Sequence, residues 1–158
     1  LIDKRRDELC ANDTTTDSLI NYVIDMWDSP DILWTHVTCP FFEAKDYSNA
    51  ISAYFKALES NENDSLMGCG RMQTFLWGEH GPLFERSNGN LWPFSQNIKP
   101  IYDIDSTVFI VPFSIAVRSR DRIGFKPMLF ENNGLSSMDI DTANQFDTAQ
   151  KIWSSINN

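Results

Sequence analysis

A strand–helix–strand pattern in the first half of the chain limits the fold more than any other feature. The run "DILWTHV" (31–37) is short, β-rich and mostly apolar, and "TCP" ends it. Apolar residues then recur at helical spacing over 47–58, and "SLMGCGRM" (65–72) is a second strand-like run. Two strands joined through a helix form a right-handed βαβ unit, and ligands bind at the carboxyl ends of such strands. We therefore expect an α/β domain with a mostly parallel sheet.

The remaining elements follow from the same kinds of pattern. We expect a helix over 16–27, strands over 106–112 and 126–131, and a last helix that begins near 142. At the start of the last helix, Thr142 and Gln145 match a capping box. The apolar stripe expected to be buried on that helix comprises Phe146, Ala149 and Trp153. With 158 residues, the chain is expected to form one domain, 1–158.

Residues 78–104 differ in character from the rest of the chain. They are rich in Gly, Pro, Asn and aromatic residues and show no clean period, which indicates an excursion from the sheet. Exposed aromatic side chains in such a segment favour a subunit interface. The alternative is a long ordered loop that folds back onto its own sheet.

Charge and cysteine content exclude several classes of protein. Lys and Arg number 13 against 22 Asp and Glu, a formal net charge of −9, and no basic stripe is interleaved with aromatics, so we expect no nucleic-acid partner. The three cysteines are widely spaced without a C-x-x-C, which indicates neither a disulfide framework nor a structural zinc site. No apolar run approaches the ~20 residues of a membrane span, and no signal peptide opens the chain. These features favour a cytoplasmic protein with reduced thiols.

An acidic pair stands immediately before the last helix. If the chain is extended there, Asp139 and Asp141 face the same side, and two convergent carboxylates are what Mg²⁺ takes from a protein. The alternative is that Asp141 only supports the helix cap while Asp139 is solvated. Asp103 and Asp105 repeat the spacing before a strand, so spacing alone does not choose between the pairs.

Single candidates elsewhere are ambiguous. Thr38 and Cys39 precede a proline and either line a ligand-binding edge or include an ordinary buried thiol. Arg5 either pairs with phosphate or belongs to a solvated charge run. His36 and His80 are the only histidines, and neither has a Cys or Asp at ligand or triad spacing, which favours structural roles.

In order along the chain, five segments resemble motifs of the acylneuraminate cytidylyltransferase (CMP-sialic acid synthetase) family, covering Arg5 to Trp153. The segment "KRRDELCANDTTT" resembles the family's R-P-x-x-L-A segment, and "HVTCPFF" its Q-P-T-S-P-L loop. The segment "DSLMGCGRMQTFLW" resembles D-S-V-x-S-V and the K-T-F-L-W-like stretch after it. The segment "SQNIKPIYDIDSTVFIV" resembles R-x-Q-x-L-x-P-x-Y-x-x-N-G-x-x-Y-I. The closing "SSMDIDTANQFDTAQKIW" is similar to D-I-D-T-x-x-D-F-x-x-A-E-x-L.

This resemblance implies a three-layer, Rossmann-like (GT-A-like) nucleotidyltransferase fold that forms a homodimer through residues 78–104. The implied reaction transfers CMP from CTP to a hydroxyl of an acidic, nine-carbon (nonulosonic) sugar and releases pyrophosphate. Family members bind the catalytic Mg²⁺ through the acidic pair before the last helix, which corresponds to Asp139 and Asp141. The positions that match nucleotide-side motifs are Arg5, Thr38 and Cys39. The positions that match sugar-side motifs are Gln73, Gln96, Asp105 and Phe109.

Several departures from the family pattern limit what the resemblance implies. The family's first strand and its nucleotide-binding loop would lie before Leu1, so we expect a fragment that does not turn over alone. Gln73 stands at a family Lys, Asp105 at an Asn and Phe109 at a Tyr, and no Arg precedes Gln96. Because such positions usually meet the sugar's carboxylate, two alternatives stay open: a nucleotidyltransferase for another sugar, and a non-catalytic relative that acts as a binding or scaffold domain.

Overall fold

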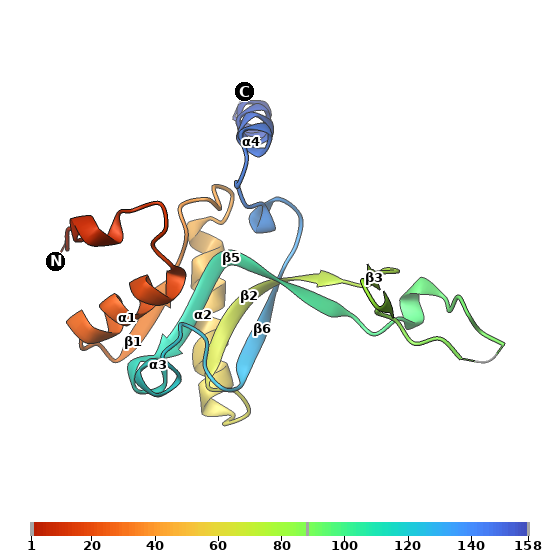
Figure 1. The fold of residues 1–158 in the computed structure, drawn as a ribbon, viewed down its shortest axis with the longest axis horizontal. Coiled ribbons are helices and arrows are strands. Elements are labelled where there is room, and N and C mark those ends of the chain that lie inside the picture. Colours follow the sequence, from red (N-terminus) through yellow and green to blue (C-terminus); the bar gives the residue numbers. More distant parts are fainter. Residues whose placement is uncertain (1, 88, 158) are drawn as a thin grey trace.

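Strand β5 lies inside a four-stranded sheet around which the helices are arranged (Figure 1). The computed structural model describes residues 2–87 and 89–157. The strands of the sheet, in the spatial order β1-β5-β2-β6, are β1 (Asp31–Trp34), β5 (Ile101–Pro112), β2 (Ser65–Met72) and β6 (Pro127–Asn132). The helices are α1 (Thr16–Met26), α2 (Ala44–Glu59), α3 (Phe113–Ser119) and α4 (Ala143–Ile156), with 3-10 turns at Asp7–Leu9, Ser95–Asn97 and Gly134–Ser137.

The sheet is mixed, because β5 runs against its neighbours. It pairs antiparallel with both β1 and β2, whereas β2 and β6 pair in parallel. Strands β1, β2 and β6 therefore point the same way. This confirms that the two strands of the expected strand–helix–strand unit, β1 and β2, run in the same direction. However, β1 and β2 are not neighbours, since β5 returns between them. The carboxyl ends of β1, β2 and β6 consequently lie at one edge of the sheet.

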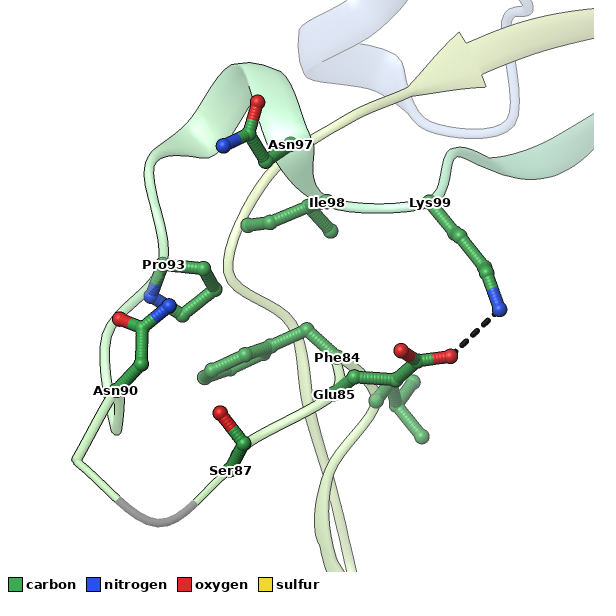
Figure 2. Close-up of a pocket in the computed structure, with 9 residues that line it drawn as sticks. Phe84, Glu85, Ser87, Asn90, Pro93, Asn97, Ile98 and Lys99 are labelled. Atoms are coloured by element: carbon green, nitrogen blue, oxygen red, sulfur yellow. Dashed lines mark hydrogen bonds and ion pairs between the residues drawn. The ribbon is translucent and has the colours of Figure 1, made fainter.

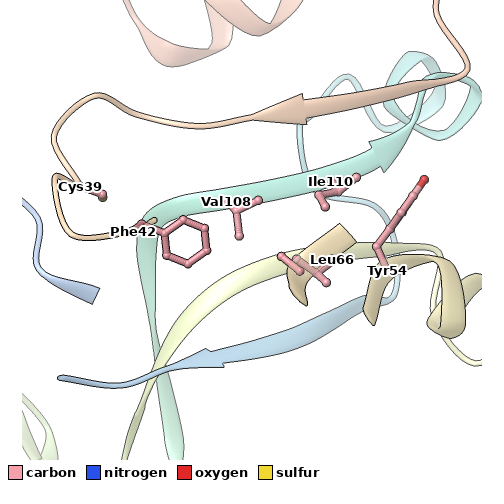
Figure 3. Close-up of a cluster of buried hydrophobic side chains, with 7 residues drawn as sticks. Cys39, Phe42, Tyr54, Leu66, Val108 and Ile110 are labelled. Atoms are coloured by element: carbon pink, nitrogen blue, oxygen red, sulfur yellow. The ribbon is translucent and has the colours of Figure 1, made fainter. Parts of the chain in front are cut away.

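Helices cover both faces of the sheet, giving the three layers expected. Adjacent residues of a strand point to opposite faces. Val108 and Ile110 accordingly pack with Tyr54 of α2 and with Leu66, as Figure 3 shows. On the opposite face, Val111 packs with buried side chains of α1 and α3, namely Ile20, Ile24 and Ala116.

Helix α4 stands away from the sheet (Figure 1). Its start is as expected: Thr142 accepts a hydrogen bond from the Gln145 N–H, and the two residues form a capping box. The expected buried stripe is wrong for two of its three residues, since Ala149 is buried but Phe146 and Trp153 remain 55% and 54% exposed. The reason is that loop residues of the 38–42 segment, rather than the sheet, face this helix, with the Phe41 and Trp153 rings 6.4 Å apart.

Between β2 and β5 the chain leaves the body of the protein as an extended arm, residues 73–100 (Figure 1). The arm contains a small ladder of β3 (Trp77–Gly78) with β4 (Gly81–Pro82). Trp77, Trp92 and Phe94 are exposed, whereas Phe84 is buried against the rings of Phe75 and Trp92.

Of the helices in the described ranges, none is long and apolar enough to cross a membrane.

Candidate functional site

A bulge in β5 shapes the edge where the other strands end. Met67 of β2 pairs with Phe109, but Cys69 already pairs with Ile104, so Gly68 alone lies opposite residues 105–108. A bulge of this kind turns the strand and redirects its side chains. Residues 105–108 thereby form part of the same edge as the ends of β1, β2 and β6.

Asp105 is buried inside this bulge and holds it together. Its carboxylate accepts hydrogen bonds from the Thr107 N–H (3.1 Å), the Thr107 hydroxyl and the Asn132 side-chain amide (2.8 Å). Asn132 also donates to the Thr107 hydroxyl oxygen at 2.8 Å. Gly68 makes room for the network, because a Cβ there would lie 2.5 Å from Asp105 Oδ1. Asp105, matched by the resemblance to a sugar-side position, is thus engaged by donors of the protein itself.

Asp139 lies where three segments of the chain meet. The Ile140 N–H donates to the Thr38 carbonyl oxygen at 3.0 Å, which joins the loop after β1 to the loop before α4. Burial raises the pKa of Asp139, but the nearby side chains of Thr38 and Ser106 and the Ile140 N–H outweigh it. The net effect lowers the pKa of Asp139, so its carboxylate is ionised at neutral pH.

The two carboxylates of the acidic pair differ in environment. Asp139 Oδ1 is buried and has no hydrogen-bond partner among the residues that the structure describes. Asp141 is exposed, and its N–H donates to Gln145 Oε1 at 2.9 Å as part of the helix cap. Asp139 is therefore not the solvated residue of the alternative interpretation, whereas Asp141 does contribute to the cap.

The Asp139 carboxylate has the chemistry that a hard divalent cation takes from a protein. A buried carboxylate oxygen without a hydrogen-bond partner is unfavourable, and a bound cation would supply the missing interaction. Across residues 2–87 and 89–157, no group of three or more His, Cys, Asp and Glu side chains is arranged to hold a metal ion. Mg²⁺ typically uses one or two carboxylates and completes its shell with water and phosphate oxygens, so a site limited to Asp139 and Asp141 is compatible with it.

Cys39 lies directly behind this edge as a buried thiol. Burial raises its pKa to about 12, and the negative charges of Asp139 and Asp105 act in the same direction. The thiol is therefore protonated at neutral pH and is a poor nucleophile. The structure thus brings together Thr38, Cys39 and Asp139, three residues that the sequence pattern had proposed for the site.

Other predicted site residues lie elsewhere. Arg5 is exposed and, with Trp27 and Trp34, lines a hollow of about 230 Å³ beside α1. Phe109 is buried on the face covered by α1 and α3, with the Arg122 guanidinium 4.1 Å from its ring centre.

Gln73 and Gln96 lie together in the arm. The Gln73 side-chain amide donates to the carbonyl oxygens of Gln96 (2.9 Å) and Ile98 (2.8 Å). Ile98 in turn lines a hollow of about 360 Å³ (Figure 2). Phe84 forms part of this hollow, and at its margin Glu85 pairs with Lys99 at 2.5 Å.

Several residues at the edge were not singled out by the sequence pattern. Ser106 directly follows Asp105, and Asn132 is a polar residue at the end of a strand. The local sequence could therefore have indicated both. His36 had been assigned a structural role, and Arg122 contacts it across 86 positions of sequence, which no local pattern reveals.

Comparisons with known proteins support the fold. No family model matches the sequence, and no curated protein matches it significantly. Among solved structures, the chain is similar to the crystal structure of 4-diphosphocytidyl-2C-methyl-D-erythritol synthase from Anaerococcus prevotii DSM 20548. The TM-score is 0.63 at 12% sequence identity, over 89% of this chain and 67% of that chain. The described residues thus share the Rossmann-like α/β fold of that protein.

Proposed function

We propose that the chain is a cytidylyltransferase that transfers CMP from CTP to a hydroxyl of a nonulosonic, sialic-acid-like sugar and releases pyrophosphate. The observation that carries the proposal is that the loop of Thr38 is bonded to the loop of Asp139 at one edge of the sheet, where Asp139 Oδ1 is buried without a partner among the described residues. The fold neighbour, named as a diphosphocytidyl synthase, supports the same class of reaction. So does the order of the five motif-like segments along the chain.

In this proposal Asp139 and Asp141 hold Mg²⁺, which when bound neutralises charge on the phosphates during phosphoryl transfer. Thr38 and Ser106 help to keep the Asp139 carboxylate ionised. Cys39 stays protonated and contributes packing rather than a covalent intermediate. The sugar hydroxyl would then attack the α-phosphate directly and displace pyrophosphate, with Thr38 on the nucleotide side.

A second candidate, a nucleotidyltransferase for another sugar, is favoured by how two sugar-side residues are engaged. Asp105 already accepts hydrogen bonds from Thr107 and Asn132, and the Gln73 amide is bonded to two backbone carbonyls. A carboxylate repels the carboxylate of a sugar, and the two amide hydrogens of Gln73 are already donated within the protein. A less acidic sugar would need no cationic group.

The arm would supply the contacts of a homodimer. Trp77, Trp92 and Phe94 are large, exposed and close in sequence, and aromatic residues of this kind are enriched at interfaces. The proposed enzyme would work in the cytoplasm on small molecules, with no nucleic-acid partner, in keeping with its net charge of −9.

The test is pyrophosphate release from CTP and Mg²⁺ with a panel of nonulosonic acids and neutral sugars, using the complete gene product that contains this sequence. Asp139→Asn should lower the rate by about 100-fold or more, because it removes the carboxylate proposed to bind Mg²⁺. Asp103→Asn is the matched control, since Asp103 occupies the other D-I-D and is exposed on β5. It should leave the rate unchanged.

Calorimetry separates the enzyme from a non-catalytic relative. The proposal is supported if CTP binds in the presence of Mg²⁺ and the Asp139→Asn variant binds it more weakly. A folded protein that releases no pyrophosphate with any sugar and binds no CTP with Mg²⁺ overturns it in favour of a scaffold or binding domain.

A further inference from the structure

His36 Nε2 faces two hydrogen-bond donors. The Trp34 indole N–H donates to it at 3.2 Å, and the Arg122 guanidinium nitrogen Nη1 lies 2.6 Å from it. An indole N–H and a guanidinium are donors only. His36 Nε2 must therefore carry no proton, and its single lone pair is shared between the two donors. The neutral ring then bears its single proton on Nδ1.

Arg122 is held in place mainly by this contact and by aromatic rings. Its guanidinium lies 4.1 Å from the centre of the Phe109 ring and 5.9 Å from that of Trp34, within cation–π range. Phe109 and Trp34 are cross-strand neighbours in the β1–β5 pairing, so the rings form one platform. Within the described ranges, no carboxylate lies within 4.0 Å of the guanidinium. A half-buried arginine that pairs with an imidazole rather than with an acid is an unusual arrangement that needs a reason.

The contact has a direct path to the candidate site. His36 is two residues before Thr38. The Thr38 carbonyl oxygen accepts a hydrogen bond from the Ile140 N–H, and the Thr38 side chain lowers the pKa of Asp139. The preceding residue, Thr35, is also fixed, because its hydroxyl donates to the Thr107 carbonyl oxygen at 2.8 Å. The segment 35–38 is thus tied to the bulge at one end and to the Asp139 loop at the other, with the His36 ring as the anchor between them.

We propose that Arg122 is a positioning residue that holds His36 as the neutral imidazole protonated on Nδ1, and so fixes the segment that presents Thr38 to Asp139. The role of this edge in a reaction rests on the proposed function, whereas the tautomer of His36 does not. Groups one contact removed from a metal or catalytic residue commonly change activity by about 10- to 100-fold when they are altered.

The first test is a long-range ¹⁵N–¹H spectrum of the imidazole rings. His36 should show an unprotonated Nε2 and a protonated Nδ1, while the exposed His80 serves as the internal reference, since most solvated imidazoles carry the proton on Nε2. Arg122→Met should move His36 to the Nε2-protonated form or to a mixture, and Arg122→Lys should retain the Nδ1 form in part. Arg118→Met is the matched control, because Arg118 is exposed and lies over a different ring, Phe125, at 5.5 Å.

The second test is pyrophosphate release by the same variants of the complete gene product. Arg122→Met should lower kcat by about 10-fold with little change in KM for CTP, and Arg122→Lys should recover part of that loss. A wild-type His36 protonated on Nε2, or an Arg122→Met protein with an unchanged tautomer, overturns the proposal. Equal losses for Arg122→Lys and Arg122→Met also count against positioning. If the tautomer behaves as expected but the wild type itself releases no pyrophosphate, the proposed function fails and the Arg122–His36 pairing stands.

Discussion

The Ile140 N–H donates a 3.0 Å hydrogen bond to the carbonyl oxygen of Thr38, joining two loops that are about a hundred positions apart in the sequence. One loop follows β1, and the other precedes α4. The bond holds the segment of Thr38 against that of Asp139, while the bulge of β5 adds residues 105–108 from a third segment. The candidate site therefore depends on backbone geometry as much as on its acidic residues, and several of the following predictions test that geometry.

Gly68→Ala should destabilise the protein, because the added Cβ would lie 2.5 Å from Asp105 Oδ1 and also against the Thr107 hydroxyl. Overpacking of this kind costs roughly 1–3 kcal/mol in free energy of unfolding. Chemical denaturation measures the difference. The control is Gly70→Ala in the same strand, where a Cβ would meet nothing within 4 Å. Equal stabilities for the two variants would mean that the bulge is not packed as described.

Asp105→Ala should cost roughly 1–3 kcal/mol in free energy of unfolding, because it leaves buried donors of Thr107 and Asn132 without an acceptor. Asp103→Ala, at an exposed position of the same strand, should change the free energy of unfolding by less than about 0.5 kcal/mol. The comparison separates a structural carboxylate from a surface carboxylate two residues away in the same strand. A marginal effect of Asp105→Ala would contradict the network and restore a direct sugar-binding role.

In the native protein, a thiol reagent at pH 8 should modify Cys10 but neither Cys39 nor Cys69. Cys10 is exposed, whereas burial raises the pKa of Cys39 to about 12 and that of Cys69 to about 11. Both values lie far above pH 8, so the reactive thiolate is scarce at these two positions and is also shielded. Mass spectrometry should find one modified cysteine in the folded protein and all three after denaturation. Rapid modification of Cys39 in the folded state would place it at an open surface.

Tyr54→Phe should lower stability at neutral pH, and the deficit should shrink at alkaline pH. The Tyr54 hydroxyl donates to Asp31 Oδ1 at 2.5 Å, and burial, followed by this bond and the charge of Asp31, raises the pKa of Tyr54. A raised pKa in the folded state gives stability that is fully present below the unfolded value of about 10 and is lost as pH rises above it. A hydrogen bond to a charged group contributes about 1.5–3 kcal/mol, which urea denaturation at pH 7 and pH 11 would detect. Tyr102→Phe, which removes a hydroxyl from a contact with the exposed Glu131, is the control.

Features that depend on residues close together in the sequence were easier to predict than features that depend on residues far apart. The capping box of Thr142 and Gln145 was predictable because both residues lie in one helical turn. The antiparallel return of β5 was not, since periodicity reveals a strand but not its partner. The exposure of Phe146 and Trp153 was likewise missed, because an apolar stripe does not specify what packs against it. The contact of Arg122 with His36 arises only from the tertiary fold.

The arm should mediate self-association through its exposed aromatic residues. Trp77 and Phe94 are 61% and 72% exposed, and burying side chains of this size stabilises an interface by roughly 1.5–3 kcal/mol each. The double variant Trp77→Ser with Phe94→Ser should therefore shift the protein from dimer to monomer in sedimentation equilibrium at micromolar concentration. Phe55→Ser, which removes an exposed ring from α2 rather than from the arm, should leave the association unchanged. A wild-type protein that is already monomeric under these conditions, or a double variant that stays dimeric, would show that the arm has another use. Because both substituted rings are solvent-exposed, the double variant should keep the wild-type circular dichroism spectrum, which distinguishes lost association from lost folding.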